Sequence, residues 1–482
     1  MSKILFIEPK APNLHIFSQF TLPRLGSFIL GTMMKNREWE VDIIIEELYS
    51  INYESYTDVD LVGISTITPT APRAYAIADR FRGMGISVIM GGPHVTYMAE
   101  EALQHCDWVI RGEGEKALMA FIDTWESNKC WTRVPNLSFC SGDQIVHNPI
   151  SAAIQNLNDI PFPDYDLLNK EIRKIAGFRI IPIQTSRGCP FDCSFCSVTG
   201  MFGKRYRYRS IENIIRELRQ YNDRKNFVFF YDDNFAVDCE RTKALLNRMI
   251  DEKFKFYWST QVRVDIGKDP ELVELMQKAH CHTLFIGFET INPATLKAIK
   301  KEQTVEDIKR SIKIIRKHHI LIHGMFIYGF DEDNWESVRE TVRFAKRSRL
   351  SSVQFLILTP FPGSEFYDKI VTEKRLKFWD WSLYDAHHAV FEPVNFTFSD
   401  LQLAQIFSHK KFYSFWESIR KVLRWKLVDV SIARYARHIN RNWRKKNKIF
   451  LKALELLAPN KNARIDVDYH ENIYLDEPLA LK

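Results

Sequence analysis

Two series of short apolar runs, each interrupted by helix-length segments, organise the chain. In the first 125 residues, apolar runs alternate with segments such as 71–82 and 115–125 that are long enough for helices. Strands that alternate with helices predict a parallel sheet covered on both faces. The predicted strands of this first series are 4–7, 41–45, 61–64, 88–90 and 108–110.

A second series begins near residue 180 and contains six β/α units over about 180 residues. One of its helices is predicted over 210–221, where Ser210 can cap the N-terminus and apolar residues from Ile211 to Leu218 recur at helical spacing. Six units are too few to close the usual eight-fold barrel, so we expect a partial, open-sided barrel. The predicted strands are 179–185, 227–231, 256–261, 284–288, 322–328 and 353–358.

Two other segments lack strand periodicity and suggest domain boundaries. Residues 126–170 contain the turn-forming sequence 161–164, which places a linker and a boundary near residue 150. After about residue 385 the strand pattern stops, and 400–457 has a helical pattern. The predicted domains are 1–150, 151–384 and 385–482. The predicted fold class is α/β, with a doubly wound Rossmann-like domain, a partial (β/α)6 barrel of the TIM type and a C-terminal helical segment.

Composition excludes several classes of protein. No run of about 18 uncharged apolar residues exists, which argues against a transmembrane helix. Residues 1–8 predict a buried strand and are too short in apolar content for a signal peptide, so we expect a cytoplasmic protein. Eight cysteines in 482 residues are too few for a disulfide scaffold, and only three of them cluster.

These three cysteines carry the strongest chemical signal. Cys189, Cys193 and Cys196 follow the first strand of the second series, at the carboxyl end of the predicted barrel, with the spacing Cys-x3-Cys-x2-Cys. Thiolates bind iron–sulfur clusters, and three of them would leave one iron of a four-iron cubane without a protein ligand. An open coordination site can bind a substrate or cofactor. A structural zinc site would need a fourth Cys or His nearby, and none follows at a suitable spacing.

The cysteine loop resembles the signature of the radical S-adenosylmethionine (SAM) superfamily, with Phe195 at its aromatic position. Further segments at the strand ends resemble the same superfamily, and with the N-terminal α/β domain they resemble its cobalamin-binding branch. That branch includes C-methyltransferases, hopanoid-modifying enzymes and the anaerobic magnesium-protoporphyrin ester cyclase. The resemblance covers about residues 1–370, and its further segments are 229–235, 287–290, 324–329 and 359–364.

The resemblance implies a 4Fe–4S cluster whose unique iron binds the amino and carboxylate groups of SAM. An electron, from a reductant such as flavodoxin or ferredoxin, would then cleave SAM to a 5′-deoxyadenosyl radical that abstracts a substrate hydrogen. The alternatives are a helix cap or surface carboxylate for each acidic residue and plain packing for each glycine. The expected SAM contacts are Phe195, Asp232, Asp233, Gly287, Glu289, Gly324 and Gly329.

Small and polar residues in the turns after the N-terminal strands are the expected cobalamin contacts, although such glycines can also serve only to make tight turns. The motif Asp-x-His-x-x-Gly, which places a His below cobalt, is absent, and His15 alone remains in that region. We therefore expect cobalamin without a protein ligand below cobalt, or a domain that has lost cobalamin. The expected contacts are Ser65, Thr66, Gly91, Gly92, Gly112, Glu113 and Gly114.

The resulting functional prediction is a cobalamin-dependent radical SAM enzyme that acts on an unactivated carbon of a small hydrophobic, lipid-like or tetrapyrrole-like substrate. The expected reaction is methyl transfer, or ring closure or oxidation. Three alternatives stay open: a cobalamin-free radical SAM enzyme, a methylthiotransferase, and a non-catalytic iron–sulfur electron-transfer or sensor protein. Methylthiotransferases carry three further cluster cysteines, whereas Cys106, Cys130 and Cys140 lack that spacing.

Positive charge is concentrated near the C-terminus. Residues 409–452 contain 14 Lys or Arg against Glu417 and Asp429, a net charge of +12, whereas the whole chain carries +7. The interleaved aromatic residues allow three interpretations: a solvated helical face, nucleic-acid binding, and docking on an anionic membrane. No recognised nucleic-acid-binding module accompanies the charge, so we expect nucleic acid to be the least suitable partner.

Overall fold

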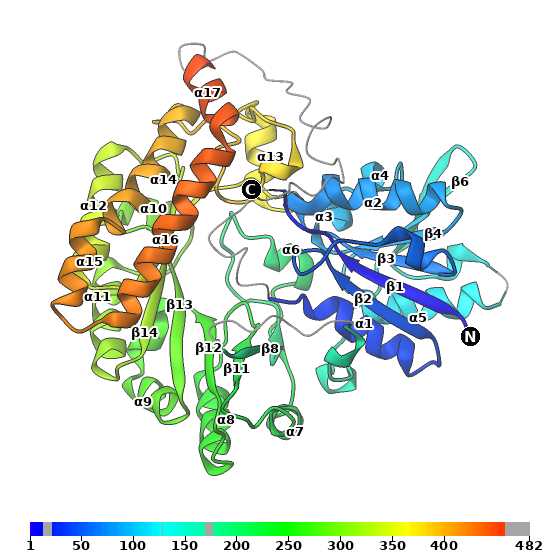
Figure 1. Cartoon of the computed structure of the whole chain (residues 1–482), viewed down its shortest axis with the longest axis horizontal. Coiled ribbons are helices and arrows are strands. Elements are labelled where there is room, and N and C mark those ends of the chain that lie inside the picture. The colour runs from blue at the N-terminus through cyan, green and yellow to red at the C-terminus, as the bar shows by residue number, and fades with distance from the viewer. Residues whose placement is uncertain (13–21, 128, 169–176, 458–482) are drawn as a thin grey trace.

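A computed structural model describes residues 1–12, 22–127, 129–168 and 177–457. The N-terminal unit is a seven-stranded sheet with the order β2-β1-β3-β4-β5-β6-β7. Helices cover both of its faces, with α2 to α4 on one face and α1 and α5 on the other (Figure 1). The strands are β1 (Lys3–Glu8), β2 (Glu40–Ile45), β3 (Leu61–Ser65), β4 (Ser87–Gly91), β5 (Trp108–Ile110), β6 (Leu137–Ser141) and β7 (Gln144–His147). The helices are α1 (Leu25–Lys35), α2 (Ala71–Gly83), α3 (Pro93–Tyr97), α4 (Ala99–Ala102) and α5 (Gly114–Trp125).

All five strands expected in the first series are present, and β1 to β5 pair in parallel. The hairpin of β6 and β7 lies in a region for which no regular structure was predicted. It adds two antiparallel strands at the edge of the sheet beyond β5. Three of the four residues of β7 are exposed, so this strand has no continuous apolar run that would reveal it in the sequence.

The second unit is a six-stranded parallel sheet in which the strands follow the chain order, β8-β11-β12-β13-β14-β15. This confirms the six predicted units and the open barrel. The strands are β8 (Arg179–Ile183), β11 (Asn226–Phe230), β12 (Tyr257–Val262), β13 (Cys281–Glu289), β14 (Leu321–Tyr328) and β15 (Ser352–Ile357), with a separate short pair of β9 (Ser186–Arg187) and β10 (Arg207–Tyr208). The helices are α6 (Val198–Phe202), α7 (Ile211–Arg219), α8 (Cys239–Asp251), α9 (Pro270–Lys278), α10 (Pro293–Ala298), α11 (Val305–Lys317), α12 (Trp335–Arg347) and α13 (Glu365–Thr372).

The C-terminal region is helical, as its sequence pattern predicted, and its helices pack on β15 at the edge of the open barrel. They are α14 (Phe398–Phe412), α15 (Phe415–Val422), α16 (Leu427–Lys446) and α17 (Lys448–Leu457). The Tyr413 hydroxyl accepts a hydrogen bond from the Val353 N–H at 2.8 Å and lies 2.6 Å from the Val353 carbonyl oxygen. Unpaired backbone groups at a strand edge invite association with other chains, so these contacts protect β15. The sequence from Pro459 onward is polar and predicts a poorly ordered tail, and this tail lies outside the described residues.

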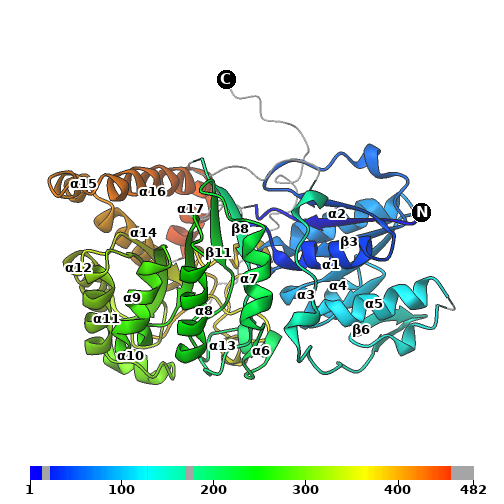
Figure 2. The ribbon, with the colours of Figure 1, turned by 90° about the horizontal axis from the view of Figure 1, so that it is seen from below.

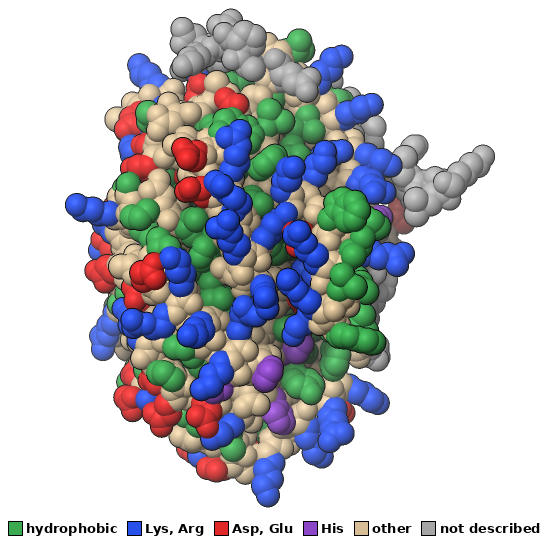
Figure 3. Space-filling model, turned by 90° about the vertical axis from the view of Figure 1, so that its left-hand side faces the viewer, with side chains coloured by type: hydrophobic (Ala, Val, Ile, Leu, Met, Phe, Trp, Pro, Cys, Tyr) green, Lys and Arg blue, Asp and Glu red, His purple; other side chains and the backbone are tan. Residues whose placement is uncertain are grey.

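The two α/β units lie side by side, and α6 lies between them (Figures 1 and 2). Lys and Arg side chains spread over the side of the molecule formed by the barrel helices and C-terminal helices, and hydrophobic side chains reach the surface among them (Figure 3). Among the described residues, no helix is long and apolar enough to cross a membrane.

Candidate active site

The cysteine loop begins at a position that only glycine can occupy without rearrangement. Gly188 has a φ of +87°, and a Cβ at this residue would lie 2.5 Å from the Arg205 carbonyl oxygen. The antiparallel pairing of β9 with β10 closes the two ends of the loop, with Arg187 opposite Arg207. The loop is therefore a closed turn at the carboxyl end of β8, where a functional site is expected in a barrel of this type.

Asp232 accepts hydrogen bonds from the residues directly before this loop. One oxygen of its carboxylate accepts hydrogen bonds from the Thr185 N–H at 2.7 Å and the Ser186 N–H at 3.0 Å, and the other accepts from the Thr185 hydroxyl at 2.5 Å. The side chain is fully buried. Both oxygens thus accept hydrogen bonds within the protein, which gives Asp232 a role in positioning the loop, and its expected contact with SAM stays a prediction.

The three loop cysteines are free thiols and are partly exposed. Desolvation raises the pKa of all three, that of Cys196 to about 12, while the nearby cations Lys301 and Arg263 act to lower the pKa of Cys193. The loop places the Cys196 N–H 3.0 Å from the Cys193 carbonyl oxygen. Iron would replace the thiol protons, because only the thiolate is a ligand.

The donor set fits a cluster rather than a single ion. Within the described part of the chain, no group of three or more His, Cys, Asp or Glu side chains gathers at a point that could hold one metal ion. A cubane distributes its thiolates over separate irons, so it needs three free, accessible thiols on one short loop. Cys189, Cys193 and Cys196 meet that requirement, whereas Cys239 begins α8 and Cys281 is buried at the start of β13.

Asp233 differs from its neighbour Asp232 in having a solvent-exposed side chain. Protein nevertheless surrounds it on most sides, and desolvation together with the Asp232 charge raises the pKa of its carboxyl group to about 7. Its charge also acts on the thiols of Cys189 and Cys196. Asp233 therefore lies beside the cysteine loop with an accessible carboxylate, as a cofactor contact requires.

Glu289 forms a nearly buried ion pair with Lys301. The Lys301 ammonium also donates a hydrogen bond to the Gly287 carbonyl at 2.9 Å. Glu289 has a φ of +59°, and the pairing of β13 with β14 is irregular between Gly287 and Glu289. A Cβ at residue 287 would overlap the Glu289 carboxylate, so Gly287 makes room for this ion pair. Strained backbone of this kind is often found at functional sites.

The remaining residues expected around SAM have packing roles in the structure. A Cβ at Gly324 would lie 2.8 Å from Leu350 Cδ1, which indicates close packing at that point. Gly329 has a φ of +117°, and its N–H donates to the Asp333 carboxylate at 2.9 Å. Phe195 packs edge-to-face on Phe330, with ring centroids 6.0 Å apart. These contacts join the cysteine loop to the turn that follows β14.

The carboxyl ends of β3 and β4 form a tight junction in the N-terminal unit. Gly92 has a φ of +106°, and a Cβ there would lie 2.5 Å from the Thr66 carbonyl oxygen. The Thr66 N–H donates to the Gly91 carbonyl at 2.8 Å, and Arg24 donates to the Ser65 carbonyl at 2.7 Å. The Thr66 hydroxyl is buried and has no hydrogen-bond partner among the described residues. An unsatisfied buried hydroxyl at this edge fits a site that a cofactor completes.

In the turn after β5, the residues expected to contact cobalamin make contacts within the protein. Gly112, with a φ of +74°, donates its N–H to the Thr96 hydroxyl at 2.9 Å, and a Cβ at Gly114 would lie 3.5 Å from Leu30 Cδ1. Glu113 is turned away from this edge toward the barrel, where its carboxylate pairs with Arg207 at 2.5 Å. Glu113 thus joins the two units, and its expected contact with cobalamin stays a prediction. His15 lies outside the described residues.

Glu113 belongs to a buried cluster of four charged side chains that joins the N-terminal unit to the cysteine loop. Arg187 lies 2.5 Å from Glu115 and 3.5 Å from Glu113, and at most 7% of any side chain in the cluster is exposed. Burial acts to raise the pKa of Glu115, but Arg187 holds it below its usual value. Since Arg187 immediately precedes Gly188, the cluster fixes the root of the cysteine loop against the N-terminal unit.

Tyr97 forms a second connection between the units. Its ring, at the end of α3, lies against both Gly200 of α6 and Gly363, and a Cβ at either glycine would overlap the tyrosine. The Tyr97 hydroxyl is buried and has no hydrogen-bond partner among the described residues. Two glycines on the barrel side thus make room for one aromatic side chain of the N-terminal unit.

This packing gives a testable prediction for Gly200→Ala. The added methyl group overlaps the Tyr97 hydroxyl, so we expect the free energy of unfolding to fall by about 1–3 kcal/mol, as at other overpacked sites. Tyr97→Phe removes the hydroxyl and should restore most of this loss in the double variant, although alone it changes stability little. Urea unfolding of the four proteins measures the effect. Equal losses for Gly200→Ala with and without Tyr97→Phe would contradict the packing.

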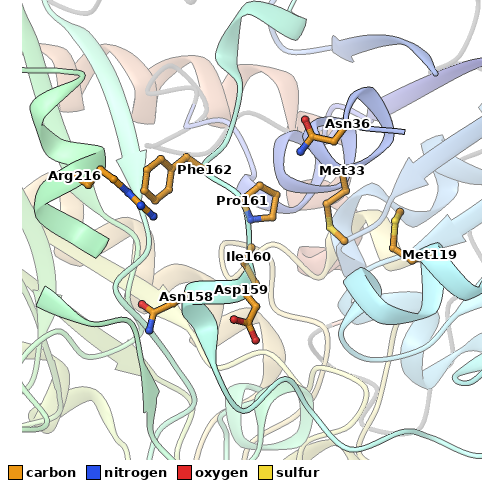
Figure 4. Close-up of a pocket in the computed structure, with 9 residues that line it drawn as sticks. All are labelled: Met33, Asn36, Met119, Asn158, Asp159, Ile160, Pro161, Phe162 and Arg216. Atoms are coloured by element: carbon orange, nitrogen blue, oxygen red, sulfur yellow. The ribbon is translucent and has the colours of Figure 1, made fainter. Parts of the chain in front are cut away.

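A surface hollow of about 390 Å³ lies elsewhere, between the linker and helices α1, α5 and α7 (Figure 4). Met33 and Asn36 line it from the C-terminal end of α1, which leads back toward the amino end of β2. The hollow is therefore far from the carboxyl ends of the strands in the N-terminal sheet. Its lining places no set of cysteines or acidic side chains together, and we do not assign the chemistry to it. The lining residues are Met33, Asn36, Met119, Asn158, Asp159, Ile160, Pro161, Phe162 and Arg216.

Several residues around the site were missed by sequence reasoning. The Arg263 guanidinium lies 3.6 Å from the centre of the Phe191 ring in the cysteine loop. Lys301, Tyr97 and Arg207 likewise act on residues that lie far from them in the sequence. Among these residues, only Arg187 could have been found from the sequence, because it directly precedes the cysteine loop.

Comparison with known families gives two matches that correspond to the two units. A model of the radical SAM superfamily matches residues 183–345, and a model of the B12 binding domain matches residues 17–122. They account for the predicted cofactor set of 4Fe–4S cluster, SAM and cobalamin. The match to the second model favours a retained cobalamin site over its loss.

Characterised and uncharacterised relatives cover most of the chain. An uncharacterised methyltransferase of Pyrococcus horikoshii is 30% identical over 410 residues, which are 82% of this chain and 89% of the relative. The bacteriochlorophyllide d C-12(1)-methyltransferase of Chlorobaculum tepidum is 28% identical over 396 residues, 81% of this chain and 83% of that one. Relatives at 27% and 24% identity include an anaerobic magnesium-protoporphyrin IX monomethyl ester cyclase of Cereibacter sphaeroides, over 73% of this chain and 60% of its own, and a hopanoid C-2 methylase of Rhodopseudomonas palustris, over 74% and 65%.

The fold is similar to that of a solved enzyme. The radical SAM methyltransferase TsrM from Kitasatospora setae, solved with cobalamin and a [4Fe-4S] cluster bound, superposes with a TM-score of 0.64 at 16% identity, over 77% of this chain and 75% of that one. This confirms the predicted fold class of a Rossmann-like unit with a partial barrel.

Proposed function

Because the chain belongs to the radical SAM superfamily and carries an N-terminal B12-binding domain, we propose that it transfers a methyl group to an unactivated carbon of a hydrophobic, tetrapyrrole-like or lipid-like substrate. The observation that carries the proposal is the placement of three free thiols and an accessible Asp233 where the cysteine loop is fixed against the N-terminal unit. Such an arrangement can hold two cofactors close to one substrate.

When bound, the cluster supplies the electron that cleaves the sulfonium bond of SAM, and cobalamin supplies a carrier for the methyl group. Cys189, Cys193 and Cys196 would anchor the cluster. Asp233 would accept hydrogen bonds from the amine or ribose of SAM, because its carboxylate has no hydrogen bond to another described residue. Asp232 holds the loop through Thr185.

A carbon radical reacts with most molecules that it meets, so the chain must keep water out and hold the substrate close. Tyr97 and the ion cluster around Arg187 would serve this need, because they hold the two units together on two sides of the cysteine loop. We propose that these contacts keep the distance between the cofactors constant during the reaction.

The names of the relatives support the proposed substrate class. Bacteriochlorophyllide and magnesium-protoporphyrin ester are tetrapyrroles, and hopanoids are lipids. Ring closure is the second candidate reaction because one of these relatives is a cyclase. We propose flavodoxin or ferredoxin as the electron donor, and a cytoplasmic site of action at the inner face of a membrane.

The proposed function is tested by anaerobic reconstitution with iron, sulfide, cobalamin and SAM that carries a deuterated methyl group. Absorption bands of protein-bound cobalamin and release of 5′-deoxyadenosine report the two cofactors. Transfer of the deuterated methyl group to a tetrapyrrole or hopanoid acceptor would support methyl transfer. A cyclised product without the label would support ring closure instead, and cofactor binding without any SAM cleavage would contradict both.

The adjacent aspartates give a second prediction because their surroundings differ. Asp233→Asn should leave the unfolding free energy nearly unchanged and weaken SAM binding about tenfold or more, since a charge-assisted hydrogen bond contributes ~1.5–3 kcal/mol. Asp232→Asn should instead lower the unfolding free energy by about 1–3 kcal/mol, because a buried acceptor of backbone N–H groups is lost. Urea unfolding and SAM titration separate the two effects. The reverse assignment, with Asp232→Asn affecting only SAM, would contradict the site.

A further inference from the structure

The helix pair α15–α16 ends in an exposed apolar tip. Residues 422–428, which include the turn between the two helices at 423–426, are all exposed. Leu423, Trp425 and Leu427 are 75%, 86% and 62% exposed. Large apolar side chains gathered on one surface mark an interaction site more often than isolated ones do. Val422 and Val428 beside the turn are also exposed, and so are Phe415 and Trp416 at the start of α15.

Positive charge surrounds the apolar tip. Residues 415–428 contain four Lys or Arg and one acidic residue, Glu417, which pairs with Arg420 at 2.7 Å and is 16% exposed. Seven more Lys or Arg follow along α16 and its C-terminal end in 429–448, with Asp429 as the one acidic residue of that range. The Asp429 side chain is buried, and the charges of Lys421 and Lys426 act on it. The exposed charge around the tip is therefore positive, in agreement with the spread of Lys and Arg over this side of the molecule (Figure 3).

The tip belongs to a helical hairpin that has a separate, buried apolar face, so its exposed side chains are not the uncovered inner face of a helix. Ala433, Ala436 and Ile439 of α16 are at most 2% exposed. Arg437 donates hydrogen bonds to the Tyr413 carbonyl at 3.1 Å and the Ser418 hydroxyl at 2.5 Å, which ties α16 to α15. The apolar residues at the tip are thus additional to a core that is already complete.

The backbone at the apex is held in an unusual conformation. Trp425 has a φ of +56°, a region that bulky side chains seldom adopt. The most exposed tryptophan of the tip occupies this position, where glycine or asparagine would be favoured in an ordinary turn. A strained position with an exposed aromatic side chain is typical of a functional surface.

We propose that residues 415–428 dock on an anionic phospholipid bilayer, with Leu423, Trp425 and Leu427 at the acyl boundary and the neighbouring Lys and Arg at the headgroups. Alternating apolar and basic residues match the two layers of a membrane interface, where tryptophan is also favoured. Leucine and valine have no such counterpart on a nucleic acid, whose recognition depends on phosphate contacts and base stacking. Docking would let the enzyme take its hydrophobic substrate from the membrane. Only this role of the docking rests on the proposed function.

The test is co-sedimentation of the full chain with vesicles of phosphatidylcholine alone and of phosphatidylcholine mixed with phosphatidylglycerol. We expect binding to the anionic vesicles only, and a loss of about tenfold or more in affinity when high salt screens the charges. Trp425→Asn should weaken binding about tenfold while the urea midpoint stays equal or rises, because asparagine tolerates a positive φ.

Two further variants complete the experiment. Trp379→Asn is the matched control, since Trp379 is 50% exposed outside the hairpin, and its binding should equal that of the original protein. Leu423→Ser with Leu427→Ser provides a second change to the apolar tip that leaves residue 425 as it is. We expect this variant to lose binding as Trp425→Asn does, with circular dichroism and urea unfolding as checks of folding.

Several outcomes would overturn the proposal. These are equal binding to neutral and anionic vesicles, unchanged binding of both tip variants, tip-dependent binding to a DNA or RNA duplex without vesicle binding, or a tip-dependent dimer that leaves the vesicles unbound. Vesicle binding is measured without cofactors or substrate, and SAM cleavage is measured without vesicles. Failure of membrane docking therefore does not imply failure of the proposed enzymatic function, and the reverse also holds.

Discussion

The Cys193→Ala protein should release no 5′-deoxyadenosine from SAM after anaerobic reconstitution. The cysteine loop supplies three thiols, and loss of one leaves a cubane with only two protein anchors. We expect activity to fall below detection, with loss of the cluster absorption and of its electron spin resonance signal. Cys189→Ala and Cys196→Ala should behave in the same way.

Cys239→Ala is the control for this prediction. Cys239 begins α8, and its thiol lies 3.7 Å from the Ala236 carbonyl oxygen, so it has a local partner and no place in the loop. The cluster content and SAM cleavage of this variant should match those of the original protein. A Cys193→Ala protein with a full cluster signal and normal SAM cleavage would show that the cluster assignment is wrong.

Arg187→Ala should cause the largest loss of stability among changes outside the cluster ligands. It leaves the nearly buried carboxylates of Glu113 and Glu115 with one cation, Arg207, which pairs with Glu113. Breaking a buried ion pair by removing one partner costs about 3–5 kcal/mol. We expect a correspondingly lower urea midpoint, together with weaker retention of cobalamin, because Arg187 joins the cysteine loop to the N-terminal unit.

Arg219→Ala provides the matched control for the loss of an Arg–Glu pair. Arg219 lies 2.8 Å from Glu252, but 54% of its side chain is exposed. Exposed pairs contribute about 0–1 kcal/mol, so this variant should unfold near the original midpoint and retain cobalamin. Similar midpoints for Arg187→Ala and Arg219→Ala would rule out a structural role for the buried cluster.

Hydrophobic patterning allowed most of the strands to be predicted but missed β6 and β7. The strands of the two parallel sheets are apolar on both faces because helices cover them, and this produces continuous runs such as that of β1. Strand β7 lies at the sheet edge and consists of Gln144, Ile145, Val146 and His147, with little burial. A strand that is held mainly by backbone pairing leaves almost no pattern in its side chains.

The spacing of Cys189, Cys193 and Cys196 identified the loop because all three ligands lie within eight residues of one another. Local sequence therefore determined the β/α order, the open barrel, the cysteine loop and the basic C-terminal helices. Only the tertiary structure decided which polar residues remain free. Asp232 is used by Thr185, Glu113 by Arg207 and Glu289 by Lys301, while Asp233 stays accessible. Thr185 and Arg207 come from segments far away in the sequence, and Lys301 is brought back to Glu289 by the turn that contains α10. Packing decides these contacts, and one-dimensional patterns carry no information about them.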